Sequence, residues 1–209
     1  MNTTTRIEAV NSMLAMIGAS PVSSLSGSTS ADVAMAESTL DEVSREVQSG
    51  GWHYNREYEV SLVPDDSKYI YLGNNVLRVD VEPANSTDTS STTSSYIDPV
   101  QRGNRLYDKK EHTYEFTQTV KATVIYGLDW DELPQPIKTY IAMRAGRIFC
   151  DRTVGAGSNQ SGPHSFNMIS EHQALVAVRN WDAEMADNTI FDHWDVYRVI
   201  NRTGQPNSI

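Results

Sequence analysis

The 209-residue sequence contains a single cysteine, Cys150. Without a second thiol the chain cannot form an internal disulfide, which excludes a disulfide-stapled secreted fold. No stretch approaches the roughly 18 consecutive apolar residues that a transmembrane helix requires, and the N-terminus lacks the short apolar core of a signal peptide. We therefore expect a soluble protein that is made in the cytoplasm and does not insert into a membrane.

Cationic side chains are also scarce. Lys and Arg number 17 against 27 Asp and Glu, so the net charge is −10. Each of residues 1–51, 52–130 and 131–209 carries a net negative charge. Binding duplex DNA without sequence preference, or binding an anionic membrane, requires clustered Lys and Arg. The charge distribution therefore argues against both kinds of partner.

The sequence lacks the short motifs of common enzymes. It has no glycine-rich phosphate loop, no Gly-x-Ser-x-Gly and no His-Glu-x-x-His. The histidines are scattered, and His164 and His172 are too far apart along a helix to share a metal ion. Cys150 lies within an apolar helical stripe, which favours a small buried side chain over a reactive thiol. We expect a protein that is not an enzyme, with no catalytic residue, no cofactor and no metal site.

Apolar residues recur at helical spacing in four regions. The first helix begins with the capping-box pair Thr5 and Glu8 and ends at Gly18. The second follows Ser30 and ends at Gly50, and the third follows Pro134. The fourth is expected from about Ser165 to Asp187, and its predicted buried face consists of Phe166, Ile169, Leu175, Val178, Trp181 and Met185.

Between the second and third helices, the pattern changes to short runs of β-forming residues separated by turn residues. The predicted strands are Glu57–Leu62, Tyr69–Leu72, Leu77–Val81, Tyr96–Ile97, Arg105–Tyr107 and Val120–Tyr126. Residues 85–95 are almost entirely Ser and Thr, and we expect a flexible loop because such a segment has no apolar surface to bury.

These elements predict an α+β fold. Residues 1–51 and 131–190 form an antiparallel helical bundle, with two N-terminal and two C-terminal helices. Residues 52–130 form an antiparallel β-sheet domain inserted between them, with its flexible loop at 85–95. Residues 191–209 are a C-terminal tail.

Two charged clusters call for interpretation. Asp129, Asp131 and Glu132 flank Trp130, an arrangement that suits either a glycan hydrolase or simple helix capping. The densest basic cluster lies on the third helix. Its arginines are expected to pair with carboxylates of a neighbouring helix, within or between subunits, and phosphate binding is the alternative. The candidate ion-pair residues are Arg144, Arg147, Arg152, Asp41, Glu42 and Glu46.

Three sets of residues, in this order along the chain, resemble the sequence pattern of one protein family. The first comprises Ala9-Val10-Asn11, Leu14, Ile17-Gly18, Pro21-Val22, Leu25, Ala31-Asp32 and Ala34. The second is Gln48-Ser49-Gly50-Gly51-Trp52 with Asn55, and the third is Glu132-Leu133-Pro134 with Arg144-Ala145, Arg147, Phe149 and Arg152. Together they resemble the tail tubular protein A family, the head-to-tail adaptors of short-tailed phages. One departure is Gly51, which stands where the family pattern leads us to expect arginine.

The resemblance implies a structural component of the virion tail rather than an enzyme. It implies a homo-oligomeric ring, of twelve subunits in the family, between the portal protein and the nozzle, tail tubular protein B. It also implies tail fibres as a possible further partner. DNA would pass through the axial channel without specific binding, and the candidate ion pairs would then lie between subunits.

The tail carries aromatic and cationic side chains of the kinds that anchor protein interfaces. Trp194, Tyr197 and Arg198 are therefore candidate contacts with the portal, and the alternative is that the aromatics pack on the protein's own core. Two other functions stay open from the sequence. One is a glycan-binding or glycan-hydrolysing tail component, and the other is an oligomeric scaffold unrelated to phages.

Overall fold

The computed structural model describes residues 3–26, 30–81, 98–155 and 163–186. This part of the chain contains α1 (Arg6–Met16), α2 (Ala31–Ser49), α3 (Gln135–Thr153) and α4 (Pro163–Ala186). The strands are β1 (Arg56–Leu62), β2 (Val76–Asp80), β3 (Pro99–Arg102), β4 (Arg105–Asp108) and β5 (Val120–Tyr126), with short 3-10 helices η1 (His53–Asn55) and η2 (Trp130–Glu132). Helices and antiparallel strands confirm the predicted α+β fold class.

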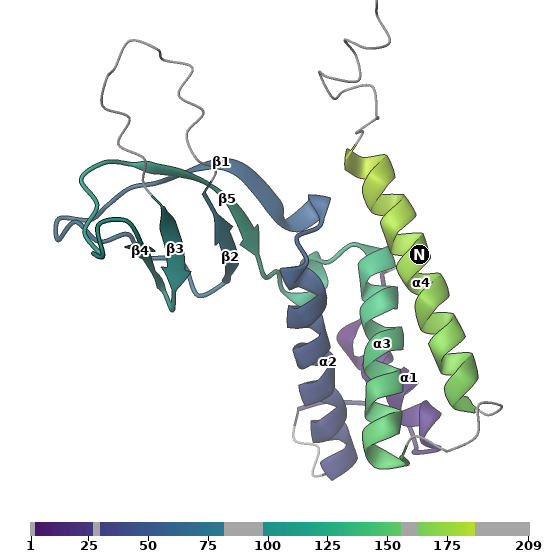
Figure 1. The fold of residues 1–209 in the computed structure, drawn as a ribbon. Helices are drawn as coiled ribbons and strands as arrows, with labels where there is room; N and C mark the ends of the chain where they lie inside the picture. The colour runs from purple at the N-terminus through teal and green to yellow at the C-terminus, as the bar shows by residue number, and fades with distance from the viewer. Residues whose placement is uncertain (1–2, 27–29, 82–97, 156–162, 187–209) are drawn as a thin grey trace, which may run out of the picture.

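The helices form one body in which α3 is the central element, packed against α1, α2 and α4 (Figure 1). Figure 1 shows α2 and α4 on opposite sides of α3, with the strands displaced to the side of α2. The apolar stripes predicted from the sequence meet in this core, where Leu14, Leu40, Ile141 and Phe149 are at most 1% exposed. Burial of these faces is the main force that holds the helices together.

Local hydrogen bonds begin α1 and hold the loop that follows it. Thr5 and Glu8 form the predicted capping box, in which the Thr5 backbone N–H donates to Glu8 Oε2 at 2.7 Å. After α1, the Asn11 amide donates to the Val22 carbonyl at 2.9 Å and accepts from its N–H at 2.8 Å. These bonds hold the loop against α1. Asn11 and Val22, which belong to the first set of family-like residues, therefore have a structural role.

The strands form two antiparallel sheets. The larger has the order β1-β5-β2, and the smaller is the β3–β4 hairpin. A second apolar core lies between them, with Ile70, Leu72, Leu106, Phe116 and Val120 at 6% exposure or less. The β region therefore has a core of its own, separate from that of the helices.

The strand predictions were largely correct, with two differences. Residues Tyr69 and Tyr71 form isolated bridges to Glu115 and Arg105 rather than a continuous strand, and β3 was not anticipated. Strand β3 begins with a proline and ends with the polar pair Gln101-Arg102, so most of its residues have low β-propensity and do not predict a strand. The predicted strand at 96–97, the Ser/Thr segment 85–95 and the tail 191–209 lie outside the described residues.

The predicted buried face of α4 was partly wrong. Val178 is fully buried, and Leu175 and Trp181 pack against the core, but Ile169 and Met185 are 55% and 50% exposed. Ile169 falls on the other side of the helix from Val178, because nine residues correspond to two and a half turns. The side chain of Phe166 lies outside the described residues.

Candidate functional site

The helical body and the strands are joined at the C-terminal end of α2 by a buried amide. Gln48 is 2% exposed, and its side chain reaches the segment that leads from β5 to η2. It accepts from the Leu128 N–H at 2.7 Å and donates to the Leu128 carbonyl at 3.1 Å. A side-chain amide that satisfies both groups of one residue fixes that segment against α2 in a single register.

A second buried amide, Asn55, extends this junction to β5. Its Nδ2 donates to the carbonyls of Gln48 and Tyr126 at 2.9 and 2.7 Å, and its Oδ1 accepts from the Trp52 N–H at 2.9 Å. Trp52 in turn donates from its indole to the Val47 carbonyl at 2.7 Å. These side chains form a continuous polar network at the helix-to-sheet junction, which is the segment that the sequence resemblance picked out.

Glycine at position 51 is explained by this geometry. Gly51 is buried with φ of +74°, and a Cβ there would lie 2.3 Å from Ile125 Cδ1. Its carbonyl accepts a hydrogen bond from the Arg56 guanidinium. The expected arginine is therefore replaced by glycine at 51, and an arginine five residues later contacts the same turn.

The predicted basic cluster of α3 is paired with carboxylates of α2 and α4 within the same chain. Arg144 contacts Glu46 of α2 at 2.6 Å and Glu171 of α4 at 2.8 Å. Arg147 contacts Glu171 as well, and Asp151 at 3.0 Å. Glu171 therefore bridges two arginines, and α3 is linked electrostatically to both neighbouring helices.

Two further pairs involve the other carboxylates predicted for α2. Arg152 contacts Glu42 at 2.8 and 3.0 Å, which is the geometry of a bidentate pair, and this hydrogen bond lowers the pKa of Glu42. Asp41 pairs with Arg6 of α1 at 2.7 Å. The sequence located these residues but not Arg6 or Glu171. Whether the same residues also meet a second subunit remains a prediction.

The outer face of α4 carries exposed apolar side chains. Met168 and Ile169 are 53% and 55% exposed, and Val176 is 42% exposed two turns later. Ile169 and Val176 share one side of the helix by their spacing, opposite the side that Val178 buries against the core, and Met168 lies at the flank between the two sides. Exposed apolar stripes of this kind mark interaction surfaces. Sequence reasoning missed it because it assigned α4 a single apolar face.

The residues of the remaining candidate sites are packed or hydrogen-bonded in ways that stabilise the fold. Trp130 is 8% exposed and packs in the helical core, and its indole donates to the Thr4 carbonyl at 3.0 Å. It therefore offers no open ring for a sugar beside Asp129, Asp131 and Glu132, and Glu132 accepts from the Asp129 N–H at 3.2 Å as a cap. Cys150 is half-buried.

Over the described ranges, no three His, Cys, Asp or Glu side chains are grouped as a metal site, and no helix could cross a membrane. The candidate portal contacts Trp194, Tyr197 and Arg198 lie outside the described residues.

Comparison with known protein families gives a match over most of the chain. The model of a family described as tail tubular protein matches residues 7–188, which spans the fold from the first turn of α1 to the end of α4. None of the curated proteins matches the chain.

Proposed function

This chain belongs to the tail tubular protein family and is a structural component of a phage tail, and from that premise we propose that it is the ring-forming adaptor. In this proposal it is a tail tubular protein A, and copies of the chain form a ring, of twelve subunits by family resemblance. The ring joins the portal protein to the nozzle and leaves an axial channel for the genome. Tail fibres are a further proposed partner.

The observation that carries the ring is the outer face of α4. Its apolar stripe lies at one edge of the helical body, and α2 lies at the other edge, across α3 (Figure 1). The outward side of α2 offers Ala34, Met35 and Ser38, of which Met35 is 41% exposed. Small side chains next to an exposed methionine suit the bulkier stripe of α4.

A contact between α4 of one copy and α2 of the next would use two different surfaces. Such heterologous contacts generate rings when the rotation between copies closes. The arrangement of opposite edges on one body therefore supports a ring rather than a two-fold dimer. It would bury apolar surface that a single chain leaves in water.

The charge of the chain supports the channel. Each copy carries −10, and none of the three segments is basic. Multiplied around a ring, this charge creates a negative potential that repels the DNA backbone. DNA would then slide through the ring without being held, which agrees with the lack of clustered Lys and Arg.

The proposed portal contact is the C-terminal segment with Trp194, Tyr197 and Arg198. Aromatic and arginine side chains are enriched at the centres of protein interfaces. A chain that ends at residue 190 is expected to lose attachment to portal rings in a co-sedimentation assay. Unchanged attachment of this truncated chain would contradict the proposed portal contact and leave the ring itself unaffected.

Electron microscopy of the purified chain with purified portal rings tests the adaptor proposal. We expect a ring of copies on the portal, including when the chain alone is monomeric, because the portal can act as the template. Ile169→Asp and Val176→Asp should abolish that ring, since a carboxylate at the contact has no partner for its charge. Val63→Asp, at a residue 67% exposed in the β region, is the matched control and should assemble normally. A wild-type chain that forms no ring on the portal would contradict the proposal.

A further inference from the structure

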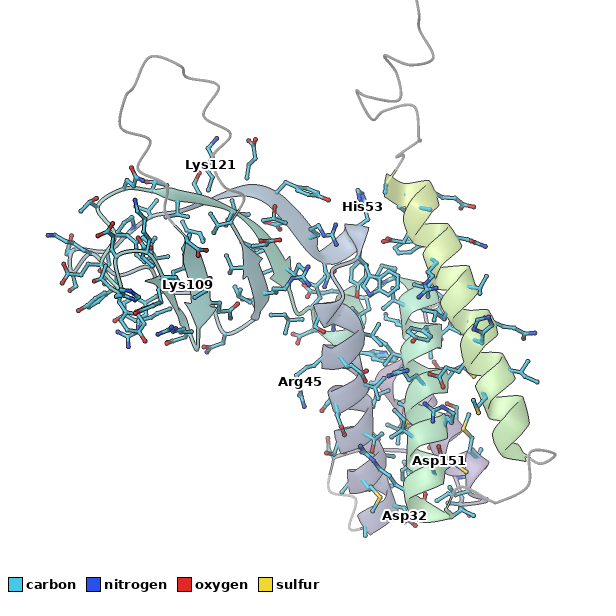
Figure 2. All side chains as sticks on the ribbon, in the orientation of Figure 1. Asp32, Arg45, His53, Lys109, Lys121 and Asp151 are labelled. Carbon is cyan, nitrogen blue, oxygen red and sulfur yellow. The ribbon has the colours of Figure 1, made fainter. Side chains whose placement is uncertain are left out.

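The β3–β4 hairpin and the segment beside it contain several tyrosines and arginines. Figure 2 shows the side chains of this region, in which Lys109, the residue after β4, is labelled. The backbone places residues 69–72 next to β4, with a bridge between Tyr71 and Arg105 and a 3.1 Å hydrogen bond from the Leu106 N–H to the Ile70 carbonyl. Side chains alternate across such a sheet. Ile70 and Leu106 face the inner core at 1% and 0% exposure, which places Tyr69, Tyr71 and Arg105 on the outer face.

Six residues make up this outer surface, which we call the Tyr–Arg face: Tyr69, Tyr71, Arg102, Arg105, Tyr107 and Tyr114. The two arginines are opposite one another in the hairpin register. Tyr71 is 54% exposed, Arg102 is also exposed, and the other four are half-buried. In Figure 1, β3 and β4 lie on the side of the β region away from the helices, so this surface is remote from α4.

The side chains of the Tyr–Arg face hold one another in place. Arg102 stacks on the Tyr107 ring at 3.6 Å from its centroid, and Tyr107 meets Tyr114 at 4.8 Å. Arg105 lies 4.7 Å from the Tyr114 centroid and 5.5 Å from that of Tyr69. Stacking between cations and rings makes the surface more rigid than separate long side chains would be.

Neither arginine of this surface has a carboxylate partner in the part of the chain that the structure describes. This sets them apart from Arg6, Arg144 and Arg152, which all form ion pairs. A guanidinium that is stacked on a ring keeps its N–H donors at its edge, where a carboxylate can bind in a bidentate way. The Tyr–Arg face is thus pre-organised to receive anionic side chains from outside the chain.

We infer that the Tyr–Arg face is a docking surface for carboxylate side chains of the nozzle protein. This inference rests on the proposed adaptor function, for which it names the surface that binds the next tail component. Tyrosine and arginine are the side chains most enriched at the energetic centres of protein interfaces. Charge complementarity then selects an acidic patch on the partner.

Nucleic acid and glycans fit the Tyr–Arg face less well. Binding of single-stranded nucleic acid uses several rings on which successive bases stack. Here the Tyr107 ring is covered by Arg102, and Tyr71 is the one exposed tyrosine of this surface. Neutralisation of a DNA backbone requires many cations, whereas residues 52–130 carry a net negative charge. A second copy of this chain is the other conceivable occupant, and the experiment below separates it.

Binding of the purified nozzle protein to portal-bound rings tests the inference, with affinity measured by biolayer interferometry at several salt concentrations. The double variant Arg102→Gln/Arg105→Gln should weaken binding by about tenfold or more, and Tyr71→Ala should weaken it as well. Arg78→Gln, at an exposed arginine on β2, is the matched control and should bind like the wild type. Arg105→Lys, which keeps the charge but not the planar group, should also bind more weakly. Binding of the wild type should weaken with added salt more steeply than that of the double variant.

The outcomes separate this inference from the adaptor proposal. If the double variant forms rings on the portal and binds the nozzle protein as tightly as the wild type, the inference is overturned and the adaptor proposal stands. If the double variant forms no rings, the Tyr–Arg face contacts a second copy instead and the inference is again overturned. Circular dichroism and the thermal midpoint of each variant establish that it has folded.

Discussion

At the scale of single residues, two buried side-chain amides at the junction help to fix the β region against the helical body. Gln48 and Asn55 satisfy backbone groups of Leu128 and Tyr126, which are distant in sequence. An unpaired buried carbonyl or N–H costs free energy, so each amide stabilises one arrangement over others. Neither residue belongs to a motif with a known chemical role.

Gly51 is expected to tolerate no other residue without loss of stability. Its φ of +74° is unfavourable for residues with a Cβ, and that Cβ would meet Ile125. We predict that Gly51→Ala lowers the free energy of unfolding by about 1–2 kcal/mol, as measured by urea denaturation. Gly103→Ala is the control: its φ is also positive, at +63°, but nothing lies within 4 Å. If Gly51→Ala proves no less stable than Gly103→Ala, contact with Ile125 adds no cost.

Removal of the buried Tyr54 hydroxyl, in contrast, should stabilise the protein. Within the described part of the chain its buried hydroxyl has no hydrogen-bond partner, and its ring lies 6.3 Å from that of Trp181. Removing an unsatisfied buried hydroxyl removes its desolvation cost, so Tyr54→Phe should raise the free energy of unfolding by up to about 1 kcal/mol at pH 7. Urea denaturation measures this difference.

The same substitution should change the response to alkali. Burial, followed by the negative charge of Asp182, raises the pKa of Tyr54 above its ordinary value of about 10. The neutral phenol is therefore favoured in the folded state, whereas the unfolded chain gains free energy by ionising above pH 10, so stability falls as pH rises above 10. The wild type should lose more stability above pH 10 than Tyr54→Phe, and equal losses would contradict this assignment.

At the scale of elements, α3 owes its central position to both apolar and charged contacts. Its apolar side packs on α1 and α2, and its arginines reach carboxylates of α2 and α4. The pairs that involve Glu42 and Glu46 are solvent-exposed and contribute little individually, whereas Glu171 is only 13% exposed. The apolar contacts supply most of the packing free energy. The pairs chiefly fix which faces of the helices meet.

The Glu42–Arg152 pair should make α2–α3 packing sensitive to acid. Arg152 lowers the pKa of Glu42 below its ordinary value of 4.5. A lowered folded-state pKa contributes stability that is present above pH 4.5 and is lost as pH falls through the folded value. Between about pH 5 and pH 3, which brackets the ordinary pKa of a carboxyl group, the free energy of unfolding should therefore fall more for the wild type than for Glu42→Gln.

Arg152→Gln provides the control for this pH effect. Without its partner, Glu42 loses the cause of its lowered pKa, so this variant should show the same reduced acid sensitivity as Glu42→Gln. The double variant should add nothing further, because the two substitutions remove one interaction. Additive losses would mean that the two side chains act separately.

The α4 helix shows where element-scale prediction was inadequate. Apolar residues occur on two sides of it, and the sequence pattern combined them into a single buried face. Only packing against α3 and η1 determines that Val178 is buried and Ile169 is exposed. Ile169, which was predicted to be buried, is one of the residues that support the proposed contact between copies.

At the scale of the whole molecule, the helical body and the β region have separate cores and are connected through the junction. The proposed function places different partners on the two parts: other copies and the portal on the helices, and the nozzle on the Tyr–Arg face. A rigid junction would maintain the geometry between these surfaces.

Asn55→Ala should weaken that connection. It leaves the Gln48 and Tyr126 carbonyls without their side-chain donor, which we expect to cost about 1–3 kcal/mol. Limited proteolysis should release the helical and β parts faster from this variant than from the wild type. Asn74→Ala, at an exposed asparagine, is the control and should be cleaved at the wild-type rate. Equal cleavage of both variants would show that Asn55 does not hold the two parts together.

Local sequence was sufficient for much of this architecture. Apolar periodicity located the four helices, β-branched and alternating runs located β1, β2, β4 and β5, and the Thr5–Glu8 spacing predicted a cap that the structure contains. Those features depend on side chains a few residues apart, so a single sequence expresses them. The arginines of α3 were likewise recognised as ion-pair partners.

Only the tertiary structure decided which of these residues meet. Arg6 pairs with Asp41, Arg144 with Glu171, and Arg105 lies among tyrosines from separate segments, contacts that join positions far apart in the chain. The residues next to Gln48 in the sequence do not indicate that its amide is buried. The amide becomes buried and hydrogen-bonded only because Leu128, which follows β5, packs against α2. Composition and periodicity set the acidic charge and the helix–strand–helix order, whereas long-range packing created the surfaces through which the protein is proposed to assemble.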